Sequence, residues 1–198
     1  MTKTFVSGFN VHDDLKELTV PELQDLATKD RLHFAVCLLN IEYDLNIGNC
    51  IRTAHITGAE KIFIIGNEKI DSRGTVGAHN YTTVIKRKIN PNEDLISVFW
   101  KTMHEENDEI YIPIFLEKND TSVPISYEAF NNISFLYKLG FKFCLVLGNE
   151  QGGIPKKLME NSLILHIPQR GVIRSLNVAS ACAIACHEIR NYLENRFG

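Results

Sequence analysis

Five short apolar segments alternate along this sequence with stretches in which apolar residues recur at helical spacing. Each segment is bounded by turn residues, and several are apolar at successive positions, as expected of strands that are covered on both faces. The segments are 33–40, 61–66, 109–116, 141–148 and 163–168. Strand patterns that alternate with helical patterns predict an α/β fold, a mostly parallel sheet flanked by helices.

The helical stretches have recognisable boundaries. Thr19-Val-Pro-Glu22 has the spacing of a capping box and predicts a small N-terminal helix. Asn46 is a plausible cap, and Gly48 lets the chain turn into a helix over 49–57. Pro155 suits the first turn of a short helix. The remaining predicted helices are 92–104, 156–161 and 178–195.

The length and composition of the chain predict one ordinary globular domain. A chain of 198 residues with 44% hydrophobic and 23% charged residues is long enough for one buried core. No apolar run approaches the roughly 20 residues that cross a bilayer, and the first residues lack the apolar core of a signal peptide. We therefore expect a cytoplasmic protein without membrane contact.

The five cysteines form an odd set without a C-x-x-C pair. Such a set favours reduced core residues over a disulfide framework or a zinc site, so no metal is expected. The cysteines are Cys37, Cys50, Cys144, Cys182 and Cys186.

A net charge of -3 gives no general attraction to nucleic acid, so RNA or DNA binding would need local basic patches. For each basic cluster taken alone, a solvated face is the alternative. The clusters are Lys86, Arg87 and Lys88; Lys156 and Lys157; and Arg170 with Arg174.

Polar, glycine-bearing loops lie at 44–52, 147–155 and 167–177. In parallel sheets, ligands collect beyond the carboxyl ends of the strands, where such loops meet helix N-termini. In the first loop, Asn49 and Arg52 lie three residues apart on one helix face, and an arginine there can hold a phosphate. The alternative is a helix cap followed by a surface arginine.

The other two loops also allow two interpretations each. Gly148, Gly152 and Gly153 permit close backbone approach to a ligand, but their spacing matches neither the dinucleotide-binding nor the P-loop pattern. Ser175 or Asn177 can cap the last helix. Because a cap needs only one such residue, the surplus of polar side chains in the third loop suggests a binding wall. That surplus consists of Gln169, Arg170 and Arg174.

Three motifs in register resemble those of the SpoU (TrmH-like) branch of the SPOUT RNA methyltransferases. They are N-x-G-N-x-x-R at 46–52, L-G-N-E-x-x-G-I at 147–154 and I-P-x-x-G-x-x-x-S-L-N-V-A at 167–179. The resemblance implies a methyltransferase domain over 33–198 with a C-terminal deep trefoil knot, after a short helical extension over 1–32. It also implies S-adenosylmethionine as cofactor, bent into the knot, and a homodimer in which residues of one subunit lie against the cofactor of the other.

The same resemblance implies transfer of a methyl group to a ribose 2′-hydroxyl of RNA and assigns residues to roles. A guanidinium is a poor base, so Arg52 is expected to position a phosphate, and the general base is left open. The implied catalytic residues are Arg52, Asn49, Glu150, Ser175 and Asn177. The implied cofactor-binding residues are Leu147, Gly148, Gly153, Ile167, Gln169, Ser175, Leu176 and Asn177. The implied RNA-binding residues are Asn46, Arg52, Lys86, Arg87, Lys88, Arg170 and Arg174.

The sequence departs from the family pattern at two positions, and three rival functions stay open. Gln169 stands where methionine is frequent in the family, and Ala179 where serine is frequent. Only about 30 residues precede the first predicted strand, which favours transfer RNA over ribosomal RNA as substrate. The rivals are a catalytically silent RNA-binding protein of the same fold, a base methyltransferase, which the S-L-N-V segment disfavours, and an unrelated nucleotide-binding enzyme.

Overall fold

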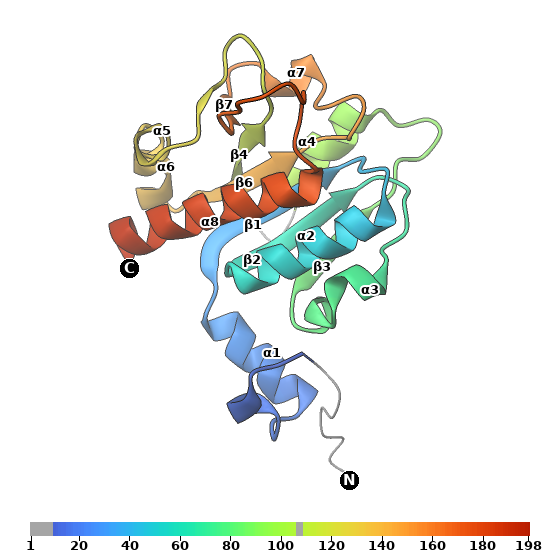
Figure 1. Ribbon diagram of the computed structural model, residues 1–198, viewed down its shortest axis with the longest axis vertical. Helices are drawn as coiled ribbons and strands as arrows, with labels where there is room; N and C mark the ends of the chain where they lie inside the picture. Colours follow the sequence, from blue (N-terminus) through green and yellow to red (C-terminus); the bar gives the residue numbers. More distant parts are fainter. Residues whose placement is uncertain (1–9, 106–108) are drawn as a thin grey trace.

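A computed structural model describes residues 10–105 and 109–198 (Figure 1). Its described strands form one seven-stranded sheet in the order β3-β2-β1-β6-β4-β7-β5, and every pairing is parallel. The strands are β1 Leu32–Leu39, β2 Ala59–Ile65, β3 Thr83–Arg87, β4 Tyr111–Leu116, β5 Val123–Pro124, β6 Lys142–Leu147 and β7 Leu163–His166.

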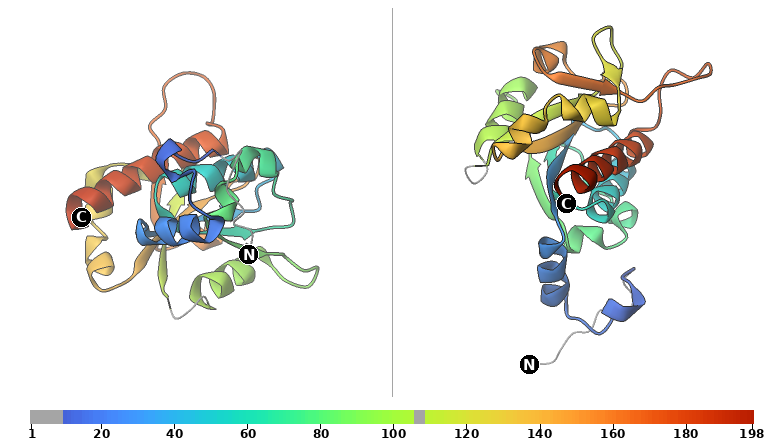
Figure 2. Two further views of the ribbon diagram at one scale, coloured as in Figure 1. Left: turned by 90° about the horizontal axis from the view of Figure 1, so that it is seen from below. Right: turned by 90° about the vertical axis from the view of Figure 1, so that its left-hand side faces the viewer.

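Helices cover both faces of this sheet (Figure 2, right). Alternate residues of β1 divide between two cores: Phe34, Val36 and Leu38 pack with α2 and α8, whereas Ala35 and Cys37 pack with α4 and α7. This division explains why the segment is apolar at every position. The helices are η1 Asp13–Leu15, α1 Val20–Lys29, α2 Asp44–Ile56, α3 Ser72–Thr75, η2 Ala78–Asn80, α4 Leu95–Glu105, α5 Tyr127–Asn131, α6 Ser134–Lys138, α7 Lys156–Met159 and α8 Val178–Phe197.

The predicted α/β architecture is confirmed, and each of the five predicted strands is present within two residues of its expected ends. The described part of the sheet adds β3 and β5, which the apolar pattern did not reveal. β3 has no fully buried residue, and β5 is two exposed residues at the sheet edge, one of them a proline. Edge strands of this kind lack the apolar signal of central strands.

The start of the helix predicted over 49–57 was wrong by five residues, whereas the ends of the helices predicted over 92–104, 156–161 and 178–195 lie within three residues of the observed ends. α2 begins at Asp44 after Tyr43, so Asn46 and Gly48 lie inside the helix and are not its cap and turn. Close packing explains the glycine, because a Cβ on Gly48 would lie 2.4 Å from the backbone oxygen of Asp71. The side chain of Asn46 is used in a buried hydrogen-bond network described below.

The predicted N-terminal helix is confirmed and lies below the amino ends of the strands, outside the two helical layers (Figures 1 and 2). Its capping box is formed: the backbone N–H and the hydroxyl of Thr19 both donate to Glu22 Oε2 at 2.7 Å. Leu23 is buried, and Gln24 Nε2 donates to the backbone oxygen of Asn80 at 2.8 Å. These contacts hold α1 against the turn that precedes β3.

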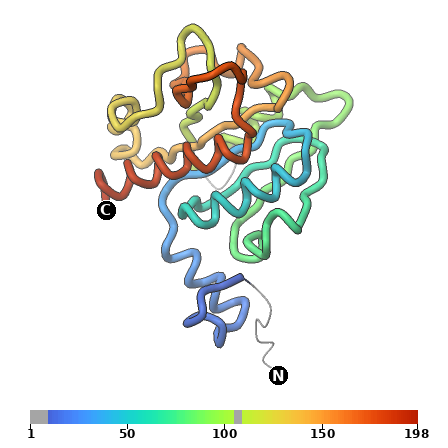
Figure 3. The backbone as a smooth tube through the Cα atoms, viewed as in Figure 1, coloured from blue at the N-terminus to red at the C-terminus, as the bar shows by residue number. Residues whose placement is uncertain are grey.

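The strand order places β7 between β4 and β5, although β4 and β5 are joined by only a short connection. Glu117 N donates to Leu165 O on one side, and Ile125 N donates to His166 O on the other. The chain leaving β7 therefore lies beside the connection from β4 to β5 (Figure 3). A knot would require this arrangement; the knot itself stays a prediction from the resemblance.

All five cysteines are buried and free, as predicted for core residues. Among the helices that the structure describes, none combines the length and the apolar character that crossing a bilayer would require.

Candidate active site

A cavity of about 570 Å³ lies at the carboxyl ends of β4, β6 and β7, against the start of α8. Ligand sites in parallel sheets occupy this edge, and the volume is in the usual range for a small-molecule pocket. The cavity brings together all eight residues predicted to bind the cofactor. These are Leu147, Gly148, Gly153, Ile167, Gln169, Ser175, Leu176 and Asn177.

Close packing around Gly148 and Gly153 shapes the cavity wall. A Cβ on Gly148 would lie 2.6 Å from the backbone carbon of Gly153, and one on Gly153 would lie 2.5 Å from Glu117 Oε2. Gly153 also has a φ of +63°, which favours glycine. The loop turns tightly because Asn149 Oδ1 accepts from the N–H groups of Gln151 and Gly152.

Three side chains, one from each sequence motif, form a continuous hydrogen-bond network at the start of α2. Asn46 Nδ2 donates to Glu150 Oε1 at 2.8 Å, and Asn177 Nδ2 donates to Asn46 Oδ1 at 3.1 Å. Glu150 Oε2 also accepts from the N–H of Glu42 at 2.8 Å. Asn46, predicted to contact RNA, is buried and takes the linking position.

Asn177 is also the cap of α8. Its Oδ1 accepts from Ala179 N at 2.9 Å and from Ser180 N at 3.3 Å. Of the two candidate caps, Ser175 and Asn177, the structure therefore uses Asn177. Ser175 lines the cavity, is exposed and makes no hydrogen bond with the described part of the chain.

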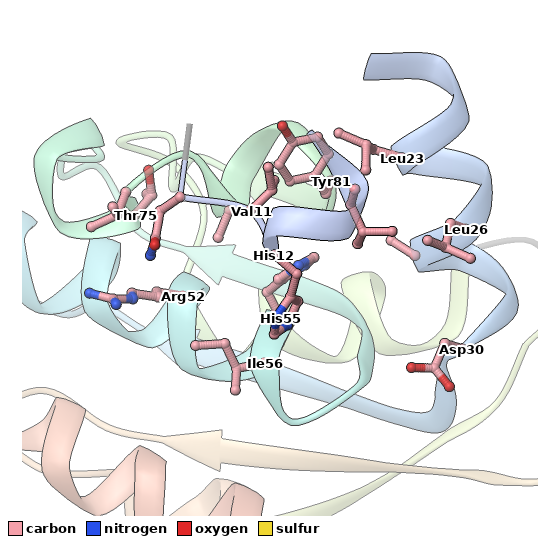
Figure 4. Close-up of a pocket in the computed structure, with 15 residues that line it drawn as sticks. Val11, His12, Leu23, Leu26, Asp30, Arg52, His55, Ile56, Thr75 and Tyr81 are labelled. Atoms are coloured by element: carbon pink, nitrogen blue, oxygen red, sulfur yellow. The ribbon is translucent and has the colours of Figure 1, made fainter. Parts of the chain in front are cut away.

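Arg52 lies outside this cavity. It is exposed on α2, about 9 Å along the axis from Asn46 at 1.5 Å per residue. Within residues 10–105 and 109–198, its guanidinium has no hydrogen bond or ion pair. Arg52 lines a second pocket of about 480 Å³, called here the Arg52 pocket, between the N-terminal segment and α2 (Figure 4). Asn49 lines neither space.

The predicted basic residues are scattered. Arg174 lines the cavity, whereas Arg170 is exposed outside it. Lys86 and Arg87 belong to β3, which β2 and β1 separate from β6, and Lys88 follows them. Lys86 Nζ donates to the backbone oxygen of Glu68. The structure therefore does not gather these residues into one patch.

The cavity contains several polar residues that the sequence analysis missed, and Glu117 and His166 are the clearest. Glu117 follows β4 directly, and its Oε2 accepts from Ile154 N at 3.1 Å. His166 ends β7, and its Nδ1 lies 3.0 Å from Ser122 Oγ. Both stand at carboxyl ends of strands, so the rule that selected the three loops also applies to them.

The fold and this cavity define a class: a parallel α/β protein with a small-molecule cavity at the carboxyl ends of its strands. Within that class, the model of the SpoU rRNA Methylase family matches residues 33–187. The chain belongs to this family.

Similar proteins agree with this membership. The chain is 29% identical over 164 residues to the tRNA (guanosine(18)-2'-O)-methyltransferase of Saccharomyces cerevisiae, covering 82% of this chain and 10% of that protein. It therefore spans about a tenth of the length of the curated relatives that it matches.

Solved structures share the fold. The TrmH/SpoU tRNA modifying enzyme of A. aeolicus is 21% identical with a TM-score of 0.68, covering 89% of this chain and 83% of that one. An AdoMet-bound rRNA methyltransferase from Sinorhizobium meliloti is 25% identical with a TM-score of 0.60, covering 86% of this chain and 60% of that one.

Proposed function

We propose that this protein is an S-adenosylmethionine-dependent RNA methyltransferase that modifies a ribose 2′-hydroxyl. The observation that carries the proposal is the single cavity that collects all eight expected cofactor residues, with the Asn46–Glu150–Asn177 network at its edge. Family membership and the AdoMet-bound relative support the same cofactor.

The chemistry of the cavity fits this cofactor. Leu147, Ile167 and Leu176 offer an apolar wall for an adenine ring, and the carboxylates of Glu117 and Glu150 suit a cationic ligand. When bound, S-adenosylmethionine supplies an electrophilic methyl group on a positively charged sulfur. The protein has to hold a ribose hydroxyl in line with that group and exclude water.

The side chains divide this work. The Asn46–Glu150–Asn177 network fixes the start of α2 against the start of α8, so the cavity wall is set before RNA binds. Arg52 is exposed and unpaired with the described residues, so its fork of donors is available to a phosphate beside the target ribose. We infer that Asn49 orients Arg52 from the preceding helical turn and that Ser175 faces the reacting centre.

Transfer RNA is the proposed substrate class, with a guanosine ribose as the first candidate. The names of the yeast and mouse relatives, both tRNA (guanosine(18)-2'-O)-methyltransferases, support it. Arg174 at the cavity and Arg170 in the adjoining loop are proposed to contact the RNA backbone, as are Lys86, Arg87 and Lys88 on β3.

Incubation with total transfer RNA and methyl-labelled cofactor tests the function. A ribose 2′-O-methyl group blocks alkaline cleavage at its own nucleotide, so the label is expected in alkali-resistant dinucleotides. Label in mononucleotides would indicate base methylation. Label in neither fraction, with cofactor bound and the RNA intact, would favour the silent RNA-binding alternative.

We also propose a homodimer. Exposed apolar side chains surround the third motif and the adjoining face of α8, and an apolar surface of this kind favours a partner. They are Val172 at 99%, Ile173 at 78%, Leu176 at 43% and Ile184 at 39% exposure. Light scattering at micromolar concentration is expected to give twice the chain mass, and a monomer mass would refute the dimer.

We retain the division into a helical extension over 1–32 and a methyltransferase domain over 33–198. The position of α1 outside the two helical layers supports it. A cytoplasmic location is proposed on the five free, buried cysteines, since reduced thiols are usual in that compartment.

A further inference from the structure

The Arg52 pocket shares no lining residue with the cofactor cavity, so its role differs from cofactor binding. It lies between the N-terminal segment with α1 on one side and α2 with the 75–81 turn on the other (Figure 4). Its volume of about 480 Å³ is in the range of small-molecule sites.

The lining of the pocket suits a flat, polar-edged ring. His12, His55 and Tyr81 bring aromatic rings to it, and the centroids of the last two lie 6.0 Å apart. Ile56 and Val76 leave 63% and 43% of their surface exposed beside them. Proteins bind unstacked RNA bases on such aromatic and apolar surfaces.

His55 is held neutral and in one tautomer. Burial, and then the charge of Arg31, lower the pKa of His55 to about 4. Arg31 Nη2 donates to His55 Nδ1 at 2.9 Å, which leaves the ring proton on Nε2. A neutral ring with one N–H is suited to stack on a base or donate to its edge.

Two further polar residues belong to the lining, Tyr81 and Asp30, and the charge of Asp30 also interacts with Arg31. Within the described part of the chain, the buried hydroxyl of Tyr81 has no hydrogen-bond partner, which is costly for a buried polar group. Asp30 closes the pocket at the end of α1, and its carboxylate makes no side-chain hydrogen bond with described residues. A carboxylate accepts well from the ring N–H and amino group of guanine.

Arg52 connects this pocket with the cavity. Figure 4 shows its side chain at one edge of the pocket, directed along α2 away from Ile56. That direction leads to the amino end of α2, where Asn46 lines the cavity. A phosphate on Arg52 would therefore lie between the two spaces.

We propose that the Arg52 pocket binds a purine base of the RNA substrate, guanine fitting best, while Arg52 holds the phosphate that joins this nucleotide to the methylated one. This deepens the proposed function and rests on it for the identity of the RNA. The N-terminal segment thus forms one wall of the RNA site, and Asp30 selects the base.

The first test uses mononucleotides and does not depend on methyl transfer. The methyl resonances of Leu26, Ile56 and Val76 are followed by NMR during titration with guanosine 5′-monophosphate and, separately, cytidine 5′-monophosphate. We expect saturable shifts at millimolar concentration, at least about threefold tighter for the purine because of its larger stacking surface. Ala27→Phe, which fills the pocket from α1, should abolish them.

The second test measures binding of total transfer RNA in the presence of S-adenosylhomocysteine. Ala27→Phe should weaken RNA binding by about 10-fold, and the exposed Ile56→Ala by less, at unchanged cofactor affinity. Thr28→Phe, on the same helix but outside the lining, is the matched control and should bind as the wild type does.

Absence of methyl shifts with either nucleotide, or wild-type RNA affinity in folded Ala27→Phe, would overturn the pocket assignment. Those results would leave the proposed function intact if ribose methylation is observed. Conversely, saturable nucleotide shifts without any methyl transfer would support the base-binding pocket and contradict the proposed methyltransferase function.

Discussion

At the scale of single residues, the structure separates two groups that sequence proximity had joined. Asn46 belongs to the buried network at the cofactor cavity, whereas Arg52, six residues later, faces the Arg52 pocket. A helix explains the separation, because six residues advance about 9 Å and turn the side chain to another face. Binding of cofactor and positioning of RNA are therefore expected to respond to different substitutions.

Arg52→Ala should abolish most methyl transfer while leaving cofactor affinity unchanged. The loss is expected to be on the order of 10²–10³ in rate, since a charge-assisted contact to the reacting RNA is removed. Arg52→Lys should restore little, because a point charge cannot reproduce the fork of donors. Full turnover by Arg52→Ala, or a parallel loss of cofactor binding in calorimetry, would show that the role is misassigned.

Asn46→Asp should destabilise the fold by about 1–3 kcal/mol at neutral pH, measured by urea unfolding. The new carboxylate keeps an acceptor for Asn177 but faces Glu150, and two like charges in contact disfavour ionisation of both. Because a proton shared by the two carboxyl groups relieves the repulsion, the loss of unfolding free energy in Asn46→Asp should shrink as the pH falls from 7 to 5. Asn132→Asp, at an exposed position, is the control. Equal stability of both variants at pH 7 would argue against the network.

At the scale of elements, the contact between α2 and α3 depends on Gly48. In most helices, Gly→Ala stabilises by about 0.5–1 kcal/mol. Here the added Cβ would lie 2.9 Å from Gly74 Cα as well as against Asp71, so Gly48→Ala should instead destabilise by about 1–3 kcal/mol. Gly152→Ala, whose Cβ would have only Asn149 Oδ1 nearby, at 3.5 Å, is the control in the same unfolding assay. A stabilised Gly48→Ala protein would refute the close packing.

The same helix shows where sequence reasoning stops. Central strands were predictable because both faces are buried, and the capping box at Thr19 is a local device that needs no tertiary contact. Asn46 and Gly48 are ordinary cap and turn residues by local preference, and only their distant partners Glu150 and Gly74 explain them inside α2. The second and third motif loops were predictable from strand ends, whereas the first motif lies inside α2. The pocket beside Arg52 depends on how α1 packs, which no periodicity predicts. A knot is equally invisible to periodicity, since chains are unknotted by default.

At the scale of the whole molecule, a cluster of ion pairs lies at the amino ends of the strands, opposite to the cavity at their carboxyl ends. Glu109 accepts from Lys61 Nζ at 2.5 Å, from Lys142 Nζ at 2.6 Å and from the hydroxyl of Tyr111 at 2.9 Å. Lys142 also pairs with Glu60 at 2.9 Å. The cluster joins the amino ends of β2, β4 and β6 and is assigned to stability.

This cluster predicts a defined acid response. Burial raises the pKa of Glu109, but hydrogen bonds from Lys142, Lys61 and Tyr111 outweigh it and lower the pKa from 4.5 to about 2. A lowered carboxyl pKa stabilises the fold above the unfolded value and loses this contribution as the pH falls through the folded value. The melting-temperature deficit of Glu109→Gln should therefore be largest above pH 5 and shrink between pH 4.5 and 2. Glu160→Gln, at an exposed position, is the control, and a deficit independent of pH would contradict the assignment.

The central claim is that Asn46 and the segments 147–154 and 167–177 together form one cofactor site. Calorimetric titration of S-adenosylmethionine into the full chain tests it most directly, with Gly153→Val as the matched variant, since a side chain there meets Glu117 inside the cavity wall. We predict one site per chain in the wild type and a loss of at least about 10-fold in affinity in folded Gly153→Val. No heat of binding or thermal stabilisation in the folded wild type at millimolar cofactor, or unchanged affinity in the variant, would contradict the claim.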